Sequence, residues 1–335
     1  MALPPFHPGD AFAITWKVKA LRKKAGQTPF WFREPFSGGL EVAYLCDQMV
    51  YTGRTRYQRI DIVDTRVHGR MLFLDGIGQS SERDEFIYHE MLVHPALFSH
   101  PHPRSALVIG GATGASLREI LRHPSIEHVV MADIDGELTD ICKHYLPNWH
   151  RGSFQDPRLQ LVIEDGRRFV ESCHESFDCM IIDLSDPIEG GPAMYLFTIE
   201  FYDALKRRLN PGGAITFQGE GISPQDLELH ARMTNTLRRV FPTVHPYPYT
   251  LYSFHRPDAH ILATGDPDWS LKAFLERVQE TPMPTRYFCP DIAKGMFSLP
   301  RYLLEAYETC TDILTDNHLA FEEKPFEERI VHAHL

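Results

Sequence analysis

The chain has 335 residues, of which 43% are hydrophobic and 24% are charged, and its formal net charge is −11. This composition is typical of a globular protein of about two units, and no apolar run approaches the roughly 20 residues that span a bilayer. The negative charge argues against a nucleic-acid partner, because binding to phosphate backbones depends on Lys and Arg.

Residues 1–38 are predicted to be an N-terminal extension that carries one basic helix over residues 11–26. Trp16 and Lys17 interrupt the apolar stretch that a secretory signal would require. The six cysteines show no CxxC spacing and lie among apolar residues, which favours reduced thiols. We therefore expect a cytoplasmic protein.

Residues 39–82 are predicted to form a small antiparallel sheet. Short runs of alternating apolar and polar residues occur there, and Gly53, Gly69 and Gly76 separate them. Apolar residues then recur at helical spacing over residues 84–100, which predicts a helix.

Residues 83–270 are predicted to form an α/β domain with a doubly wound, Rossmann-like parallel sheet. A buried strand runs from Ser105 into Gly110 and Gly111, and a helical pattern follows directly. Further strands, each with a helix after it, are expected over residues 128–135, 159–166, 177–184 and 213–218. A hairpin over 247–254 and 260–264 should close the sheet, and 271–335 should be a helical segment with a polar tail.

The glycine turn and the following strand indicate a site for an adenosine-bearing cofactor. A turn of this kind presents backbone N–H groups and a helix N-terminus to the ligand. Asp133 ends the next strand about 20 residues further on, the distance at which a Rossmann-type acid meets the ribose hydroxyls.

Three successive strands end in a carboxylate, at Asp133, Asp165 and Asp183, and Asp186 follows shortly after. Strand ends of a parallel sheet meet at one edge, so these acids should share a site there, although Asp165 could instead cap a helix. Asp165 and its neighbours would meet the adenine edge. Two carboxylates at the reacting end suit an amine substrate, which must lose a proton before it attacks.

Four histidines, His89, His94, His100 and His102, lie close together in the sequence. Their irregular spacing and the lack of nearby cysteines argue against a metal site.

Several segments resemble the polyamine aminopropyltransferases, the family of the spermidine, spermine and thermospermine synthases. The likeness extends over roughly residues 40–310. It is strongest over residues 57–58, 74–95, 109–124, 133–138, 156–167, 181–187, 196–202 and 209–213.

The resemblance implies a methyltransferase-type Rossmann fold and a transfer from decarboxylated S-adenosylmethionine to an amine, without a metal. Asp183 would be the base. Tyr88 and Asp186 would bind the amine, and Tyr249 or Tyr247 would line its channel. A homodimer or homotetramer is expected. The nucleoside would be held by Gln58, His89, Gly110, Gly111, Asp133, Asp165 and Gly166.

The chain departs from the family at Thr113, where the glycine turn normally carries an acid that pairs with the amino group of the aminopropyl arm. Losing that charge-assisted hydrogen bond could cost about 1.5 to 3 kcal/mol of donor binding. It also removes the repulsion that would exclude a donor with a carboxylate. The leading hypothesis is aminopropyl transfer; the alternatives are methyl or aminocarboxypropyl transfer from intact S-adenosylmethionine, and a non-catalytic binder of polyamine or nucleoside.

Overall fold

The structure is a computed structural model that describes residues 28–35, 40–187, 191 and 193–319. The basic helix expected over residues 11–26 lies outside these ranges. So does the end of the predicted polar tail.

The smaller sheet has five antiparallel strands in sequence order. It begins ahead of the predicted boundary at residue 39, because Phe30 to Pro35 pair with Cys46 to Glu41. Its strands are β1 (Phe30–Pro35), β2 (Glu41–Arg54), β3 (Arg59–Thr65), β4 (Gly69–Leu74) and β5 (Ile77–Ser81).

The larger sheet has seven strands in the order β11-β12-β10-β9-β6-β7-β8. The five strands from β8 to β10 are parallel, and β12 and β11 add antiparallel pairs at one edge, which confirms the doubly wound sheet with a closing hairpin. The bounds are β6 (Ser105–Gly110), β7 (His128–Asp133), β8 (Leu159–Ile163), β9 (Phe177–Asp183), β10 (Leu209–Gly221), β11 (Thr243–Thr250) and β12 (Pro257–Thr264).

The hairpin strand expected over residues 247–254 instead spans Thr243–Thr250. Residues after Thr250 leave the strand because Ser253 binds Asp84 instead. The backbone N–H and the hydroxyl of Ser253 donate to the Asp84 carboxylate over 2.9 and 2.8 Å. This contact ties the hairpin tip to the residue that precedes α1.

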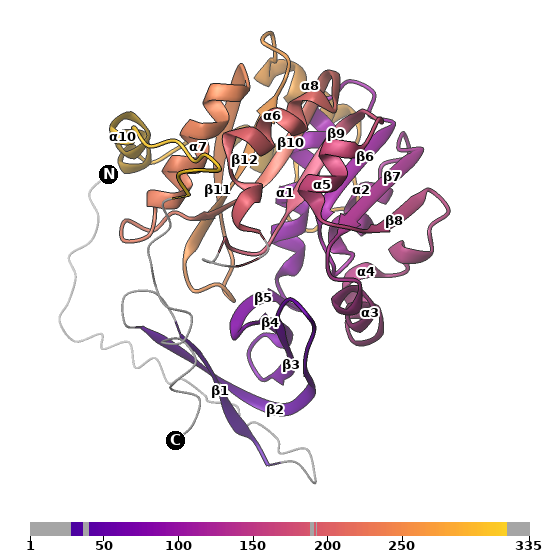
Figure 1. The fold of residues 1–335 in the computed structure, drawn as a ribbon, viewed down its shortest axis with the longest axis vertical. Helices are drawn as coiled ribbons and strands as arrows, with labels where there is room; N and C mark the ends of the chain where they lie inside the picture. Colours follow the sequence, from indigo (N-terminus) through magenta and orange to yellow (C-terminus); the bar gives the residue numbers. More distant parts are fainter. Residues whose placement is uncertain (1–27, 36–39, 188–190, 192, 320–335) are drawn as a thin grey trace, which may run out of the picture.

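Helices cover both faces of the larger sheet (Figure 1). The structure adds α4 and α9, each of which begins at a proline, a residue common at the first position of a helix. The helices are α1 (Glu85–Ser99), α2 (Ala115–Leu121), α3 (Gly136–Tyr145), α4 (Pro147–His150), α5 (Gly166–Ser172), α6 (Ile199–Arg207), α7 (Glu228–Val240), α8 (Leu271–Glu280), α9 (Pro290–Gly295) and α10 (Arg301–Thr309).

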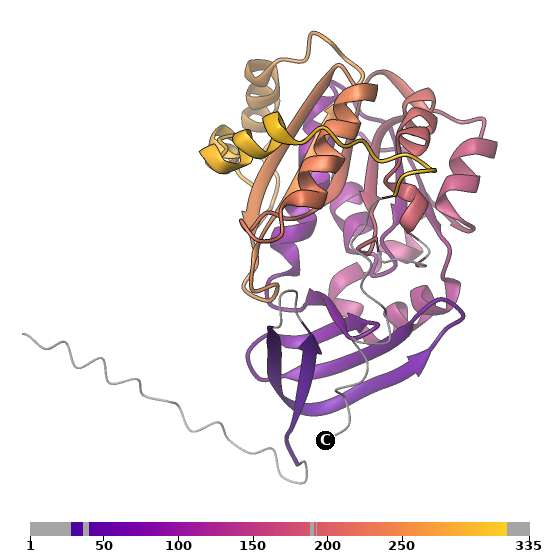
Figure 2. The same ribbon diagram turned by 60° about the vertical axis from the view of Figure 1, so that its left-hand side comes forward.

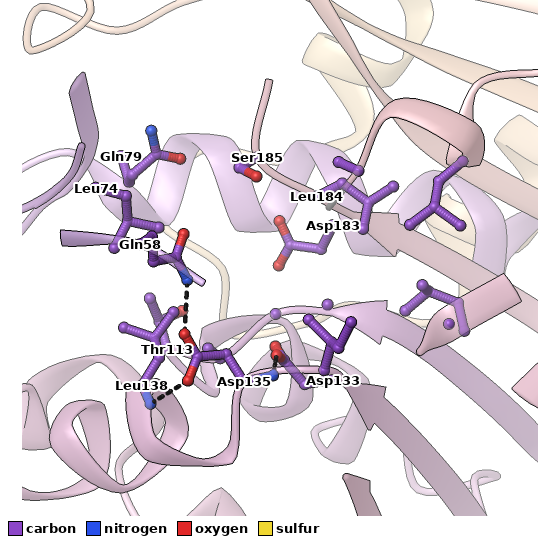
Figure 3. A pocket seen from close by; sticks show the side chains of 18 of the residues that line it. Gln58, Leu74, Gln79, Thr113, Asp133, Asp135, Leu138, Asp183, Leu184 and Ser185 are labelled. Carbon is purple, nitrogen blue, oxygen red and sulfur yellow. Dashed lines mark hydrogen bonds between the residues drawn. The ribbon is translucent and has the colours of Figure 1, made fainter. Parts of the chain in front are cut away.

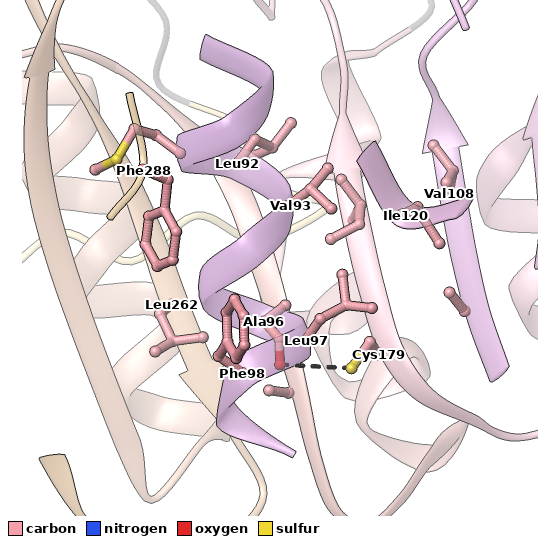
Figure 4. Close-up of a cluster of buried hydrophobic side chains, with 14 of the residues drawn as sticks. Leu92, Val93, Ala96, Leu97, Phe98, Val108, Ile120, Cys179, Leu262 and Phe288 are labelled. Atoms are coloured by element: carbon pink, nitrogen blue, oxygen red, sulfur yellow. Dashed lines mark hydrogen bonds between the residues drawn. The ribbon is translucent and has the colours of Figure 1, made fainter. Parts of the chain in front are cut away.

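Alternate strand residues point to opposite faces, so the sheet has two apolar cores. On one face Val108 packs with α1, α2 and α8, as Figure 4 shows for Leu92, Leu97 and Ile120. On the other face Leu107 and Ile109 pack with α5, α6 and α7. This burial on both sides explains why the parallel strands are nearly continuous apolar runs.

A third core joins the two sheets. Ile60, Ile62 and Leu72 of the small sheet pack against α3, α4 and the start of α2, and the indole of Trp149 donates to Ser80 Oγ over 2.7 Å. Figure 2 shows the small sheet at one end of the larger domain. The packing in this third core, together with the bond from Trp149 to Ser80, brings β4 and β5 against the glycine turn.

The six cysteines are free thiols. Cys46, Cys142 and Cys179 are buried as expected, but Cys289 is exposed because it lies in the loop that leads into α9. Within the described residues no helix is long and apolar enough to cross a membrane.

Candidate active site

The candidate site lies where the strand order reverses, between β6 and β9. Gly110 of β6 pairs with Asp183 of β9 in register, and the Gly111 N–H donates to the Asp183 carbonyl over 3.0 Å. Gly110 has a φ of 80°, and a Cβ there would lie 2.2 Å from the Asp183 carbonyl oxygen. Only glycine fits, so the turn expected to bind the cofactor also fixes the backbone of the predicted base.

Both carboxylate oxygens of Asp183 accept hydrogen bonds from hydroxyl groups. Tyr88 of α1 donates to Oδ1 over 3.1 Å, which brings together two residues predicted to act on the amine. Ser116, in the first turn of α2, donates to Oδ2 over 2.7 Å. No sequence pattern indicates Ser116, because a lone serine in a helical pattern carries no signal.

A pocket opens at this switch point, and residues from both sheets line it (Figure 3). Nine predicted nucleoside or catalytic residues contribute to it, and so do side chains of β4 and β5 that the sequence did not indicate. The predicted residues are Gln58, His89, Gly110, Gly111, Thr113, Asp133, Asp165, Gly166 and Asp183; Tyr88 also lines it, and the additional ones include Leu72, Leu74, Gln79 and Ser80.

Asp133 is buried at the end of β7 and faces this pocket. Burial raises the pKa of its carboxyl group to about 6, although the Asp135 N–H donates to Oδ1 over 2.8 Å and favours the ionised form. The carboxylate of Asp183 adds to the rise. A raised pKa in a cleft is typical of a functional carboxylate.

Asp135 fixes the pocket wall, a role that the sequence did not indicate. Its Oδ2 accepts from Thr55 over 2.7 Å and from Gln58 Nε2 over 3.0 Å, and its Oδ1 caps α3 through the Leu138 N–H (Figure 3). Gln58 is therefore oriented by a residue of the other domain.

Asp165 has both of the positions expected for it, at the N-cap of a helix and in the pocket. Its Oδ1 accepts from the Arg168 N–H over 2.8 Å, which makes it the N-cap of α5, and it lines the pocket together with Gly166. A Cβ at Gly166 would lie 2.4 Å from a methyl group of Ile109. The close approach of α5 to β6 therefore requires glycine.

His89 lines the pocket from α1, and its Nδ1 lies 2.8 Å from Glu85 Oε2. Burial lowers the pKa of His89, but the Glu85 carboxylate outweighs it and the net pKa is raised. Arg118 holds Glu85 through two hydrogen bonds of 2.9 Å. The imidazole is thus fixed by a buried ionic network.

Asp186 and Tyr249 do not line this pocket. Asp186 Oδ1 instead accepts from Gln218 Nε2 over 3.3 Å, and the same nitrogen donates to Glu220 over 3.0 Å. The ring of Tyr249 lies 6.0 Å from that of Tyr88. Both residues therefore lie on the β10 and β12 side of Asp183.

An acidic cluster, which we define as Asp186, Glu220 and Asp258 together with Arg256, occupies that side. Arg256 lies 2.9 Å from Asp258 and 3.8 Å from Glu220. Burial and neighbouring carboxylates raise the pKa of Glu220, and burial raises that of Asp258 to about 7. Three carboxyl groups thus lie around one guanidinium, an excess of acidic over basic groups. The Oε1 atom of Gln218, which lies beside the cluster, is buried and accepts no hydrogen bond from the residues that the structure describes.

Of the other histidines, His94 and His100 have structural partners, and His102 is exposed. His94 Nδ1 lies 2.9 Å from His123 Nε2, and His94 Nε2 lies 3.3 Å from Glu119. His100 lies 3.9 Å from Asp178. Among the residues that the structure describes, no group of three or more His, Cys, Asp or Glu side chains could hold a metal ion.

Comparisons with known proteins agree with this geometry. Residues 85–256 match the spermine/spermidine synthase domain, and residues 30–82 match the spermidine synthase tetramerisation domain. A crystal structure of a spermidine synthase in complex with the transition-state analogue AdoDATO is similar with a TM-score of 0.80 and 30% identity, over 88% of this chain and 100% of that one.

Curated relatives agree as well. Polyamine aminopropyltransferase 2 of Hyperthermus butylicus is 42% identical over 79% of this chain and 88% of its own length. Polyamine aminopropyltransferase 2 of Pseudomonas aeruginosa is 44% identical over 70% of this chain and 66% of its own length. On these grounds the chain belongs to the spermine/spermidine synthase family and is a polyamine aminopropyltransferase.

Proposed function

We propose that this transferase takes decarboxylated S-adenosylmethionine as donor and a linear di- or polyamine as acceptor. The observation that carries the proposal is the position of Asp183. It lies at the switch point, with the nucleoside pocket on one side and the acidic cluster on the other. Donor and acceptor would thus approach the same carboxylate from two sides.

On the donor side, Asp133 accepts hydrogen bonds from the ribose hydroxyls, and Asp165 with Gly166 meets the adenine edge. Gln58 and His89 hold the nucleoside from the side of the small sheet and α1. The positions of these residues around one pocket support the assignment.

The reaction is a single in-line displacement. Asp183 accepts a proton from the acceptor's ammonium group, and the free amine attacks the aminopropyl carbon next to the sulfonium. The new C–N bond forms as the C–S bond breaks, and the sulfur keeps the electron pair, so methylthioadenosine leaves as a neutral thioether. Catalysis depends on proximity and on proton removal, since the sulfonium is already a good leaving group.

The acceptor lies along Tyr88, Tyr249 and Asp186, with its remote ammonium at the acidic cluster. Tyr249 is buried in the hydrophobic core, Tyr88 is partly buried against it, and Asp186 follows Asp183 by three residues. The excess of carboxylates over cations there supports binding of a positively charged amine.

The pocket also bears on the alternative donor, intact S-adenosylmethionine. Its extra carboxylate would need a counter-charge, but the described lining residues include four aspartates and neither Lys nor Arg. His89 is already paired with Glu85. Although Thr113 supplies no negative charge, the remaining carboxylates favour the donor without a carboxylate.

We further propose a homo-oligomer, a dimer or tetramer, that forms through the small sheet. Trp31 and Val67, both in that sheet's region, are 60% and 50% exposed. Residues 30–82, which contain this sheet, match the spermidine synthase tetramerisation domain, and this match supports the proposal.

Incubation with decarboxylated S-adenosylmethionine and a panel of amines tests the proposal. We expect methylthioadenosine to be released only when a di- or polyamine is present. Consumption of intact S-adenosylmethionine instead would support methyl or aminocarboxypropyl transfer. Binding without turnover of either donor would support a non-catalytic role.

A further inference from the structure

Ser116 lies where it can control the orientation of Asp183. It is fully buried in the first turn of α2, and its hydroxyl donates to Asp183 Oδ2 over 2.7 Å. A helical serine commonly bonds the carbonyl four residues earlier, but the Ser116 hydroxyl bonds a side chain on another element. The contact therefore connects α2 directly to the end of β9.

The carboxylate of Asp183 is held from two directions. Tyr88 donates to Oδ1 from α1, and Ser116 donates to Oδ2 from α2. Each oxygen of a carboxylate has more than one acceptor site, so both can still receive a proton from an amine. The two hydroxyl groups thus fix the plane of the carboxylate without blocking it.

The backbone of Asp183 is fixed by the glycine turn, but that contact leaves rotation about the side-chain bonds free. Tyr88 alone would hold one oxygen and allow the carboxylate to turn about that contact. With Ser116 bound to the other oxygen, this rotation is prevented. Reacting groups must be oriented this closely for an in-line displacement.

We infer that Ser116 is a positioning residue for this transferase, acting through Asp183 and not on either substrate. The inference rests on the proposed role of Asp183 as the base. Loss of the hydroxyl would leave Asp183 in place but with a wider range of orientations.

The test is a set of single and double variants in the full chain. Ser116→Ala should lower kcat by about 10- to 100-fold, the effect expected from a small misplacement of a reacting group, with the donor KM within about twofold of wild type. Ser116→Thr keeps the hydroxyl and should restore most of kcat. In an Asp183→Asn background, Ser116→Ala should change the residual rate by less than about twofold, because both changes remove the same function.

Ser105→Ala is the matched control. Ser105 also donates to a carboxylate, that of Asp178 over 3.2 Å, but at the opposite ends of β6 and β9. This variant should keep the wild-type kcat, and its melting temperature shows what loss of such a hydrogen bond does to the fold alone.

Equal loss of rate from Ser116→Ala in the wild-type and Asp183→Asn backgrounds would overturn the inference, as would an unchanged kcat in the single variant. Failure of the proposed function is distinguishable. In that case the Asp183→Asn variant would turn over as fast as the wild-type chain.

Discussion

The Tyr88 hydroxyl donates to Asp183 Oδ1 over 3.1 Å, a contact between residues 95 positions apart in the sequence. It joins α1, which follows the small sheet, to the end of β9 in the centre of the larger sheet. The proposed base is therefore held by α1, which also lines the proposed donor pocket through Tyr88 and His89.

Replacement of Asp183 tests the base directly. Asp183→Asn keeps the shape and both hydroxyl partners but cannot take a proton from an ammonium group. We expect kcat to fall by about 10² or more, with the donor KM within a few-fold of wild type. Steady-state release of methylthioadenosine measures both parameters, and an undiminished kcat would reject the role.

Thr113→Asp restores an acid to the glycine turn. If the donor is decarboxylated, its free ammonium gains a partner, and donor affinity should stay the same or increase, by up to about 100-fold for a bond of about 1.5 to 3 kcal/mol. If the donor carries a carboxylate, the new charge should weaken binding. Isothermal titration of both proteins with both donors measures the difference, and Thr113→Asn controls for the change in shape.

Asp133→Asn should change the free energy of unfolding and the affinity for the donor in opposite directions. The pKa of Asp133 is raised from 3.8 to about 6, so the folded protein holds this proton more tightly than the unfolded chain does. This carboxyl group therefore lowers the free energy of unfolding progressively as the pH rises from about 4 to 6, and by a constant amount above that.

At pH 7.5 the Asn variant should accordingly be more stable, by on the order of 1 to 3 kcal/mol in urea denaturation, and should bind the donor more weakly. At pH 4 the gain in stability should disappear. A variant that is less stable than wild type at pH 7.5 would contradict the assigned cause of the shift.

Glu220→Gln tests the acidic cluster with two acceptors. A diamine places its remote ammonium at the cluster, whereas a monoamine of the same chain length has none to place there. The diamine KM should rise by about tenfold in the variant, as expected for loss of one charged partner, and the monoamine KM should not change. Equal effects on both amines would show that Glu220 acts elsewhere.

The same cluster predicts a pH dependence. Because burial and Asp186 raise the pKa of Glu220, and an adjacent ammonium favours the ionised form, binding of the diamine should release a proton. The wild-type diamine KM should therefore fall as the pH rises through the raised pKa of Glu220, and the fall should be smaller in Glu220→Gln. Calorimetry in buffers of different ionisation enthalpy measures the released proton.

The sequence predicted those parts of the site that follow from strand ends. Asp133 and Asp183 each follow an apolar run, and the parallel sheet brings both to one edge beside the glycine turn. Asp165 was also expected there, and its alternative role as a helix cap is confirmed.

Residues that depend on packing between distant elements were not predictable. Ser116 and Asp135 make their contacts across elements, and neither stands at a position where a local pattern is informative. Glu220 lies near Arg256 only because β10 and β12 pair. The start of the small sheet was missed because β1 is short and precedes the glycines at residues 38 and 39, which suggested a boundary there.

The most direct test of the account is to supply the wild-type chain with decarboxylated S-adenosylmethionine and a diamine and to identify both products by mass spectrometry. We predict methylthioadenosine and an amine longer by one aminopropyl group, in equal amounts. A methylated amine with S-adenosylhomocysteine, formed only from intact S-adenosylmethionine, would contradict the proposed reaction.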